Sequence, residues 1–254
     1  MSKICASLAI ITMLILCACN SSKTLAIKSS VSSPEAALLL QNTIEAHGGA
    51  RYQTAHYAFV FRDKNYTFKN NNGEYTYTVA YQKNGHGYQD ILTNNTFTRA
   101  QNGVQQELTA KQISSYGQGV NSVIYFATLP HKLNDPAVNL TYEGTTTITN
   151  KSYEILKVTF NEEGGGKDFE DTYFYWINAD SKLIEFLAYN YKVNGGGVRF
   201  REAYNPRRVE GILFQDYINY KAPVGTALAS LPQMWEHKEL KELSRIDTEK
   251  VRAL

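Results

Sequence analysis

Aromatic side chains at every second position limit the folds open to this chain more than any other feature of its sequence. They fill two blocks, residues 57–91 and 140–220, which are broken by turn signals such as Asn72-Gly73 and Asn84-Gly85. A period of two is the period of a β-strand, and such turns join antiparallel neighbours. Because no strand–helix–strand repeat accompanies the blocks, the sequence predicts about eleven antiparallel strands rather than a parallel sheet.

A first helix is expected ahead of the strands, over residues 34–47. Ser33 as N-cap would place Pro34 at the first helical position, whereas Ser32 as N-cap would make Glu35 the return partner of a capping box. The two alternatives differ by one residue in where the helix starts. The glycine pair that follows supplies the left-handed residue that ends it.

A second helix is expected between the two blocks. Apolar residues recur at three- and four-residue spacing from Ile113 to Ala127, ahead of Pro130. Gly117 and Gly119 lie inside this pattern, and each glycine costs a helix about 1 kcal/mol relative to alanine. The middle helix is therefore expected to be short, kinked or split.

So many strands in one sheet accumulate too much twist to stay flat, so the sheet must curl. Tyr173 and Tyr175 point to one face of their strand while Phe174 and Trp176 point to the other, so neither face is simply solvated. The predicted fold class is α+β and mainly antiparallel: a curved half-barrel with an N-terminal helix and an inserted central helix covering one face. Two small elements complete the prediction: a brief helix over residues 232–243 and an edge strand over 245–251.

The N-terminus predicts export and lipid attachment. Lys3 precedes a nearly unbroken apolar stretch over residues 4–18, which at roughly 15 residues is shorter than the about 20 of a membrane span and suits a signal-peptide core. The stretch ends in Leu16-Cys17-Ala18-Cys19, which resembles the bacterial lipoprotein signal, whose last cysteine is lipidated and becomes the first mature residue. The expected divisions are a signal peptide over 1–18, a tether over 19–32 that starts at the fatty-acylated Cys19, and a single domain over 33–254. The alternative is an ordinary secreted protein cut after Ala18.

Composition and charge exclude several classes of function. Lys and Arg number 26 against 24 Asp and Glu, a net charge of +2 without a concentrated basic stripe, so no nucleic-acid partner is expected. The sequence has no nucleophile elbow, phosphate-binding loop or complete dinucleotide-binding motif, and its 5 histidines lack metal-ligand spacing. The sequence thus predicts a protein that is not an enzyme, with no catalytic residue, metal or cofactor.

Two glycine-rich segments carry charge. Residues 164–171 end in acidic side chains, and residues 195–202 contain Arg199 and Arg201. Arginine offers paired donors to phosphate or carboxylate, so this cluster is a candidate site for a lipid headgroup. The interpretation that we favour is a pair of turns with a solvated or cross-strand charge network. Strand register decides whether the arginines and acids share a face, because a slip of one residue moves every side chain of a strand to the other face of the sheet.

A lipid-anchored chain with an N-terminal helix, antiparallel strands and a helix inserted halfway resembles the lipoprotein-carrier superfamily of LolA and LolB. That resemblance implies a half-barrel that holds acyl chains under helical lids. The strings YFATLPHKLNDPAVN, GGGKDFEDTYFYWIN and GGGVRFREAYNPRRVEGILFQDYINY resemble an uncharacterised lipoprotein family of Bacteroidota over roughly residues 34–251. This second resemblance implies no particular activity, and fold alone does not imply one.

Two hypotheses follow. The first is a membrane-anchored lipoprotein that binds an amphiphile, such as a lipid or the acyl part of a lipoprotein, on the concave face of the half-barrel; its expected location is the cell envelope, at the outer membrane facing the periplasm. The second is an interaction module that contacts an unknown envelope partner through the charged glycine-rich loops. A continuous apolar hollow under the middle helix favours the first, and solid packing favours the second. The candidate ligand-binding residues are Tyr77, Tyr81, Ile113, Val120, Ile124, Phe174, Trp176, Phe186, Arg199 and Arg201.

Overall fold

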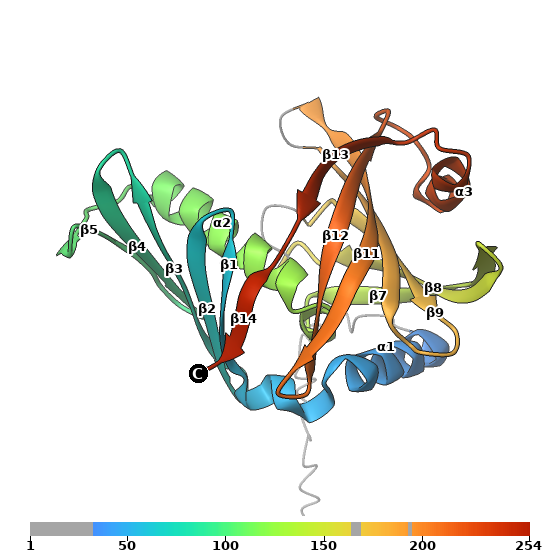
Figure 1. Ribbon diagram of the computed structural model, residues 1–254, viewed down its shortest axis with the longest axis horizontal. Coiled ribbons are helices and arrows are strands. Elements are labelled where there is room, and N and C mark those ends of the chain that lie inside the picture. The colour runs from blue at the N-terminus through green and yellow to red at the C-terminus, as the bar shows by residue number, and fades with distance from the viewer. Residues whose placement is uncertain (1–32, 164–168, 193–194) are drawn as a thin grey trace, which may run out of the picture.

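The computed structural model describes residues 33–163, 169–192 and 195–254 (Figure 1). The expected signal peptide, the tether and the lipidation site Cys19 lie outside the described residues, as does most of the first glycine-rich segment. Among the described residues, no helix combines the length and hydropathy needed to cross a lipid bilayer.

The described residues form two antiparallel sheets of seven strands each. Sheet A runs in the order β14 (Glu249–Ala253), β1 (His56–Phe61), β2 (Lys64–Asn71), β3 (Glu74–Lys83), β4 (His86–Thr93), β5 (Phe97–Gln101) and β6 (Val104–Gln105). Sheet B runs in the order β13 (Lys241–Ile246), β12 (Ile212–Ala222), β11 (Gly197–Val209), β10 (Ile184–Tyr191), β9 (Thr172–Asn178), β8 (Lys151–Phe160) and β7 (Val138–Ile148).

The C-terminal segment joins the two sheets into one open, curved wall. β13 pairs with β12 in sheet B, and β14, two residues later, pairs with β1 in sheet A (Figure 1). The buried carboxylate of Asp216 fixes the bend, because it accepts hydrogen bonds from Thr248 N at 2.8 Å and from Arg207 Nη2 at 3.0 Å. The prediction of a single edge strand over 245–251 is therefore wrong: the segment is two strands separated by a bend. This division and the short strand β6 raise the strand count above the expected eleven or so.

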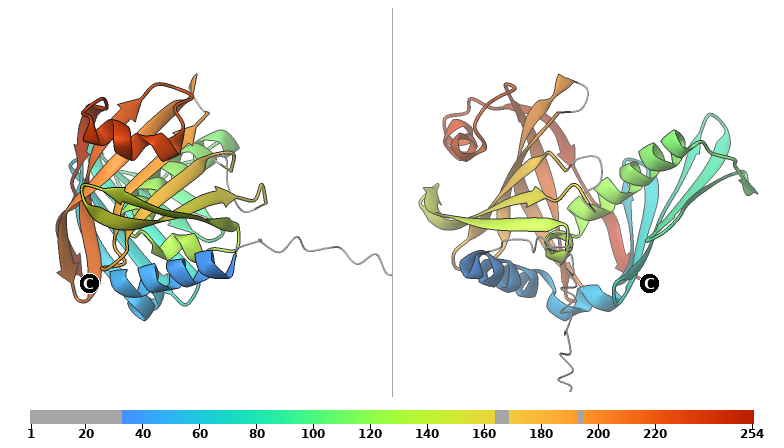
Figure 2. Two further views of the ribbon diagram at one scale, coloured as in Figure 1. Left: turned by 90° about the vertical axis from the view of Figure 1, so that its right-hand side faces the viewer. Right: turned by 180° about the vertical axis from the view of Figure 1, so that it is seen from behind.

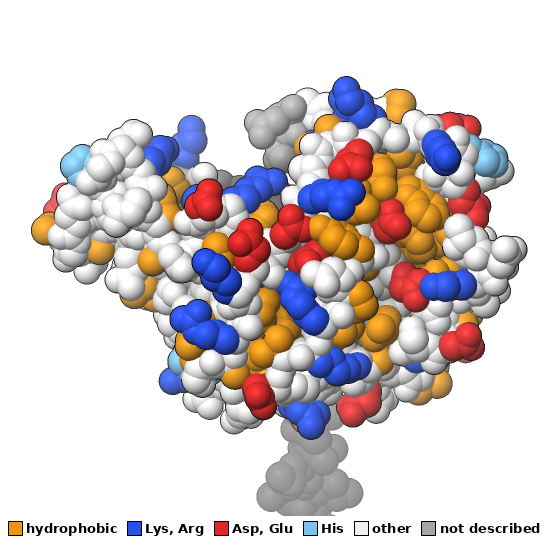
Figure 3. All heavy atoms as spheres, in the orientation of Figure 1, with side chains coloured by type: hydrophobic (Ala, Val, Ile, Leu, Met, Phe, Trp, Pro, Cys, Tyr) orange, Lys and Arg blue, Asp and Glu red, His pale blue; other side chains and the backbone are white. Residues whose placement is uncertain are grey.

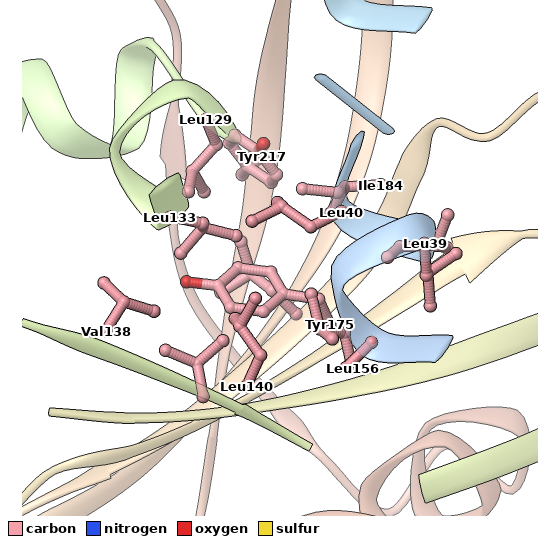
Figure 4. Close-up of a cluster of buried hydrophobic side chains, with 14 residues drawn as sticks. Leu39, Leu40, Leu129, Leu133, Val138, Leu140, Leu156, Tyr175, Ile184 and Tyr217 are labelled. Carbon is pink, nitrogen blue, oxygen red and sulfur yellow. The ribbon is translucent and has the colours of Figure 1, made fainter. Parts of the chain in front are cut away.

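The N-terminal helix α1 (Pro34–His47) has the predicted bounds. Ser33 is its N-cap, and the Ser33 hydroxyl accepts a hydrogen bond from Ala36 N at 3.2 Å. The helix packs against β7, β8 and β12, where Leu39 and Leu40 enter a cluster that also holds Tyr175 and Tyr217 (Figure 4). It therefore covers the inner face of sheet B.

The middle helix α2 (Ala110–Ala127) is one 18-residue helix, not the short or split one expected. Thr109 and Gln112 form a capping box at its start. Gly117 is buried where a Cβ would lie 3.5 Å from Leu92 and 3.6 Å from Phe97, so tertiary packing on sheet A offsets its weak helix propensity. Gly119 is exposed, and no side chain approaches it.

Sheet B is covered on both faces. Its outer face is closed by a short C-terminal unit, the 3-10 turn η4 (Leu228–Ser230) and helix α3 (Leu231–Glu236). These pack on the side chains of the outer face, among them Trp176, Phe186 and Phe200. The expected helix over 232–243 is shorter than predicted, because the chain enters β13 at Lys241.

His47 is buried at the end of α1 rather than exposed. Its Nδ1 lies 2.8 Å from the carbonyl oxygen of Thr43, and Ile184 N donates to Nε2 at 3.5 Å. Burial, together with the nearby Arg208 guanidinium, lowers the pKa of the imidazole to about 4. The ring is therefore neutral in the folded protein at neutral pH, with its proton on Nδ1.

Acid should destabilise the protein through this histidine. Between about pH 6.5 and pH 4 the unfolded chain binds a proton at His47 that the folded chain does not bind, so the free energy of unfolding falls as pH falls, by about 3 kcal/mol in all. Urea unfolding of wild type and His47→Gln across this range measures the effect. The difference between the two proteins should change by that amount, and a constant difference would contradict the assignment.

Candidate functional site

α2 crosses the space between the two sheets and contacts both (Figure 2). Val120 and Ile124 are buried against the inner face of sheet A. The residue after Ile124, Tyr125, shares a hydrogen bond of 2.9 Å with the hydroxyl of Tyr175 in sheet B. The same helix thus belongs to the core of sheet A and covers part of sheet B.

A cavity of about 230 Å³ lies beneath the C-terminal half of α2, where the two sheets meet. It is larger than the cavity of about 150 Å³ that holds one benzene. It is smaller than the roughly 300–1,000 Å³ of sites for drug-sized ligands. Side chains from β1, α2, β11, β12 and the C-terminal segment line it: Phe61, Arg62, Ser122, Val123, Phe126, Ala127, Arg201, Gln215, Tyr217, Asn219, Ile246 and Thr248.

Arg201 forms the polar part of this wall. The residue is 7% exposed, and its Cζ lies 3.9 Å from the centre of the Phe126 ring on α2. Its Nη2 donates to the hydroxyl of Tyr189 at 2.9 Å, while its Nε has no partner. Arg199 lies on the same face of β11 but only half-buried, and it donates to the hydroxyl of Tyr191 outside the cavity. The structure therefore separates the two predicted arginines into one cavity residue and one neighbour.

The remaining predicted residues fall into two groups. Tyr77, Val120 and Ile124 are buried between α2 and sheet A; Tyr81 is partly buried beside Arg99, and Ile113 is 39% exposed on α2. Phe174, Trp176 and Phe186 lie on the outer face of sheet B, under α3, on the opposite side from the cavity. None of these eight residues lines the cavity.

Several cavity residues were not predicted. Phe126 and Tyr217 contribute ring surface, and Gln215 and Asn219 contribute amides. The alternation that marks β12 places Gln215, Tyr217 and Asn219 on one face, so the sequence pattern does indicate that these three side chains lie together. Which face of that strand meets α2 depends on tertiary structure, which the pattern does not contain.

Other hollows are less suited to hold a ligand. A larger and more open one of about 500 Å³ lies beside α1, lined partly by polar side chains such as Gln41, Asn134 and Asp135. Within the described ranges, no group of three His, Cys, Asp or Glu side chains is arranged to hold a metal ion. Glu170, from the glycine-rich acidic segment, lies 3.1 Å from Lys192 in an exposed ion pair, as the favoured cross-strand interpretation expects.

Charge on the visible surface is mixed. On the face in Figure 3, Lys and Arg side chains are interspersed with Asp and Glu. This face shows no concentrated basic stripe, which agrees with the low net charge of +2.

Comparison with known proteins gives one family and several distant structures. No curated protein matches the chain. Solved structures similar to it include a LolA superfamily protein of Nitrosomonas europaea, with a TM-score of 0.49 and 10% identity over 85% of this chain and 92% of that one. A domain assigned to outer membrane lipoprotein sorting, from Vibrio parahaemolyticus, has a TM-score of 0.47 and 8% identity over 86% and 92%. A DUF1329 family protein of Desulfovibrio piger has a TM-score of 0.43 and 9% identity over 86% and 92%.

The family model covers most of the chain: residues 45–248 match the family described as a family of unknown function (DUF6503). The match spans sheet B, sheet A apart from β14, α2 and the cavity, and the chain belongs to this DUF6503 family.

Proposed function

We propose that this protein binds an amphiphile, such as a lipid or the acyl part of a lipoprotein, between α2 and the curved wall of strands. The observation that carries the proposal is the cavity beneath α2, walled by apolar side chains on one part and by polar ones on another. A concave site with an apolar body and a few convergent polar groups suits a ligand of the same character. The resemblance of the sequence to LolA and LolB points to the same ligand class.

We also propose that the protein is a lipoprotein, anchored through acylated Cys19 after removal of residues 1–18. Support comes from the apolar N-terminal stretch and the Leu16-Cys17-Ala18-Cys19 sequence that ends it. The tether would then hold the cavity close to membrane lipids, at the outer membrane facing the periplasm. In this proposal the protein accepts or presents a ligand without transforming it.

Binding of a long acyl chain requires α2 to move. The cavity of about 230 Å³ has room for part of such a chain only. The end of α2 is held on sheet B by the hydroxyl pair of Tyr125 and Tyr175, by ring contacts of Tyr125 and Phe126, and by the Arg201 guanidinium on the Phe126 ring. Each of these contacts contributes about 1 kcal/mol, so separation of this end from sheet B costs a few kcal/mol and gives a minor open state.

Native mass spectrometry of the protein purified without detergent tests the proposal. The expected result is a population with the added mass of a bound lipid, which exchanges with lipid vesicles. A clean mass of the unliganded protein, together with no uptake of lipid from vesicles, would refute the proposed function.

Stiffening α2 should slow ligand uptake. In Gly119→Ala the added Cβ meets no atom within 4 Å, so the substitution should stabilise the helix by about 1 kcal/mol and slow uptake about fivefold. Stopped-flow measurement with a fluorescent fatty acid gives the rate. The control is Ser115→Ala, also exposed on α2, which should change the rate by less than about twofold. Unchanged uptake by Gly119→Ala would exclude unwinding or bending of α2 as the limiting step.

A further inference from the structure

The cavity carries positive charge without an acidic counterpart. Two of its lining residues are cationic, Arg62 and Arg201, and none of the others is Asp or Glu. Arg62 is exposed at the rim, whereas Arg201 is more than nine-tenths buried in the wall. The wall thus holds a desolvated cation next to apolar side chains.

No partner in the described part of the chain neutralises Arg201. None of the ion pairs among the described residues includes it, and its buried Nε donates to no acceptor. Among the described residues, the guanidinium contacts the rings of Phe126 and Tyr189 and the neutral hydroxyl of Tyr189. Buried charges are normally paired, because an unpaired one costs far more than a buried neutral group. The buried guanidinium of Arg201, which lacks an acidic partner, therefore points to an anion that binds in the cavity.

An unpartnered acceptor lies beside it. Asn219 is the cross-strand neighbour of Arg201 on β12 and also lines the cavity. Its Nδ2 donates to the hydroxyl of Ser244 at 3.3 Å, while its buried Oδ1 has no partner. Two residues that line the same small cavity therefore each hold one unpartnered polar atom, a donor on Arg201 and an acceptor on Asn219.

We infer that Arg201 binds the oxyanion end of an acidic amphiphile, with Asn219 accepting a hydrogen bond from a hydroxyl or amide group next to that anion. This inference rests on the proposed function and narrows it from amphiphiles in general to those that carry a carboxylate or a phosphate ester. The first carbons of the alkyl chain pack on Val123, Phe126 and Ile246. A free inorganic anion would leave these apolar side chains without a partner, so the alkyl chain is part of what the site recognises.

Three alkyl probes of matched chain length, decanoate, decyl phosphate and decanol, test the inference together with inorganic phosphate, which has no alkyl chain. Isothermal titration should show one or both alkyl anions binding about tenfold to hundredfold more tightly than decanol, as expected for a charge-assisted hydrogen bond. The better of the two identifies the oxyanion as carboxylate or phosphate. Inorganic phosphate should bind more weakly than either.

Arg201→Met removes the charge and keeps a flexible apolar side chain against Phe126. It should bind decanoate and decyl phosphate no better than decanol while its affinity for decanol stays within about twofold of wild type. Arg199→Met, on the same face of β11 but outside the cavity, should keep the wild-type preference for anions. Arg201→Lys should also keep a preference for anions, because it keeps the charge.

Thermal unfolding without ligand distinguishes a ligand-binding role of Arg201 from a structural one. Because the charge is buried without a counter-ion, Arg201→Met should melt at or above the temperature of wild type. An anion preference that survives in Arg201→Met, or is missing from wild type while decanol binds, overturns the inference and leaves the proposed function standing. Failure of all three alkyl probes to bind would refute the proposed function itself.

Discussion

Arg99→Met is expected to destabilise the protein by about 3–5 kcal/mol, because it leaves a buried carboxylate without its partner. Asp90 on β4 is 2% exposed, and both of its oxygens accept hydrogen bonds of 2.6 Å from Arg99 on β5. The Arg99 guanidinium also lies 3.5 Å above the ring of Tyr116 on α2. Its loss should therefore weaken the attachment of α2 to sheet A as well as the pairing of β4 and β5.

A double-mutant cycle separates the ion pair from the packing around it. Asp90→Leu combined with Arg99→Met removes both charges, and replacing a buried pair by apolar side chains is often close to neutral. The double variant should therefore recover most of the stability that Arg99→Met loses. Chemical unfolding monitored by circular dichroism gives all four free energies. A loss below about 1 kcal/mol in Arg99→Met would show that Asp90 finds water or another partner.

The elements that the sequence predicted well are those set by local interactions. α1 begins after Ser33 and ends at its glycine pair as expected, because caps act within one turn. β7 begins at Val138 and β12 ends at Ala222, each within two residues of the bounds predicted for the second block of strands, since alternation is a local pattern. The failures at α2 and at the C-terminus arise from tertiary contacts: Gly117 is supported by sheet A, and the bend before β14 is fixed by Asp216 from β12.

The candidate site could be predicted only in part. Arg201 lines the cavity, whereas Trp176 and Phe186, chosen as aromatic residues of the predicted sheet, lie on the other face of that sheet. The sequence shows which side chains share a face of one strand, but not which face meets a helix distant in the chain. Register shifts in β10 and β11 add to the difficulty, because each reverses the alternation beyond it.

Trp176→Ala tests this division of the sheet into a structural and a ligand-binding face. Trp176 is 1% exposed, lies opposite Phe186 on β10, and meets the ring of Phe200 edge-on at 5.8 Å. Truncation of a buried tryptophan leaves a cavity and costs about 3–5 kcal/mol. Because the site lies on the opposite face, the protein that remains folded should bind amphiphiles with affinity within about twofold of wild type.

Phe126→Ala is the matched variant on the inner face. Phe126 is only partly buried, so its loss should cost less stability than that of Trp176. Because its ring lines the cavity and lies under the Arg201 guanidinium, the variant should nevertheless bind alkyl ligands about tenfold more weakly. Unfolding should therefore show that Trp176→Ala is the less stable of the two variants. Titration should show that Phe126→Ala is the weaker binder. If Trp176→Ala lost affinity while Phe126→Ala kept it, the ligand would bind on the outer face under α3, and the cavity beneath α2 would be a packing defect.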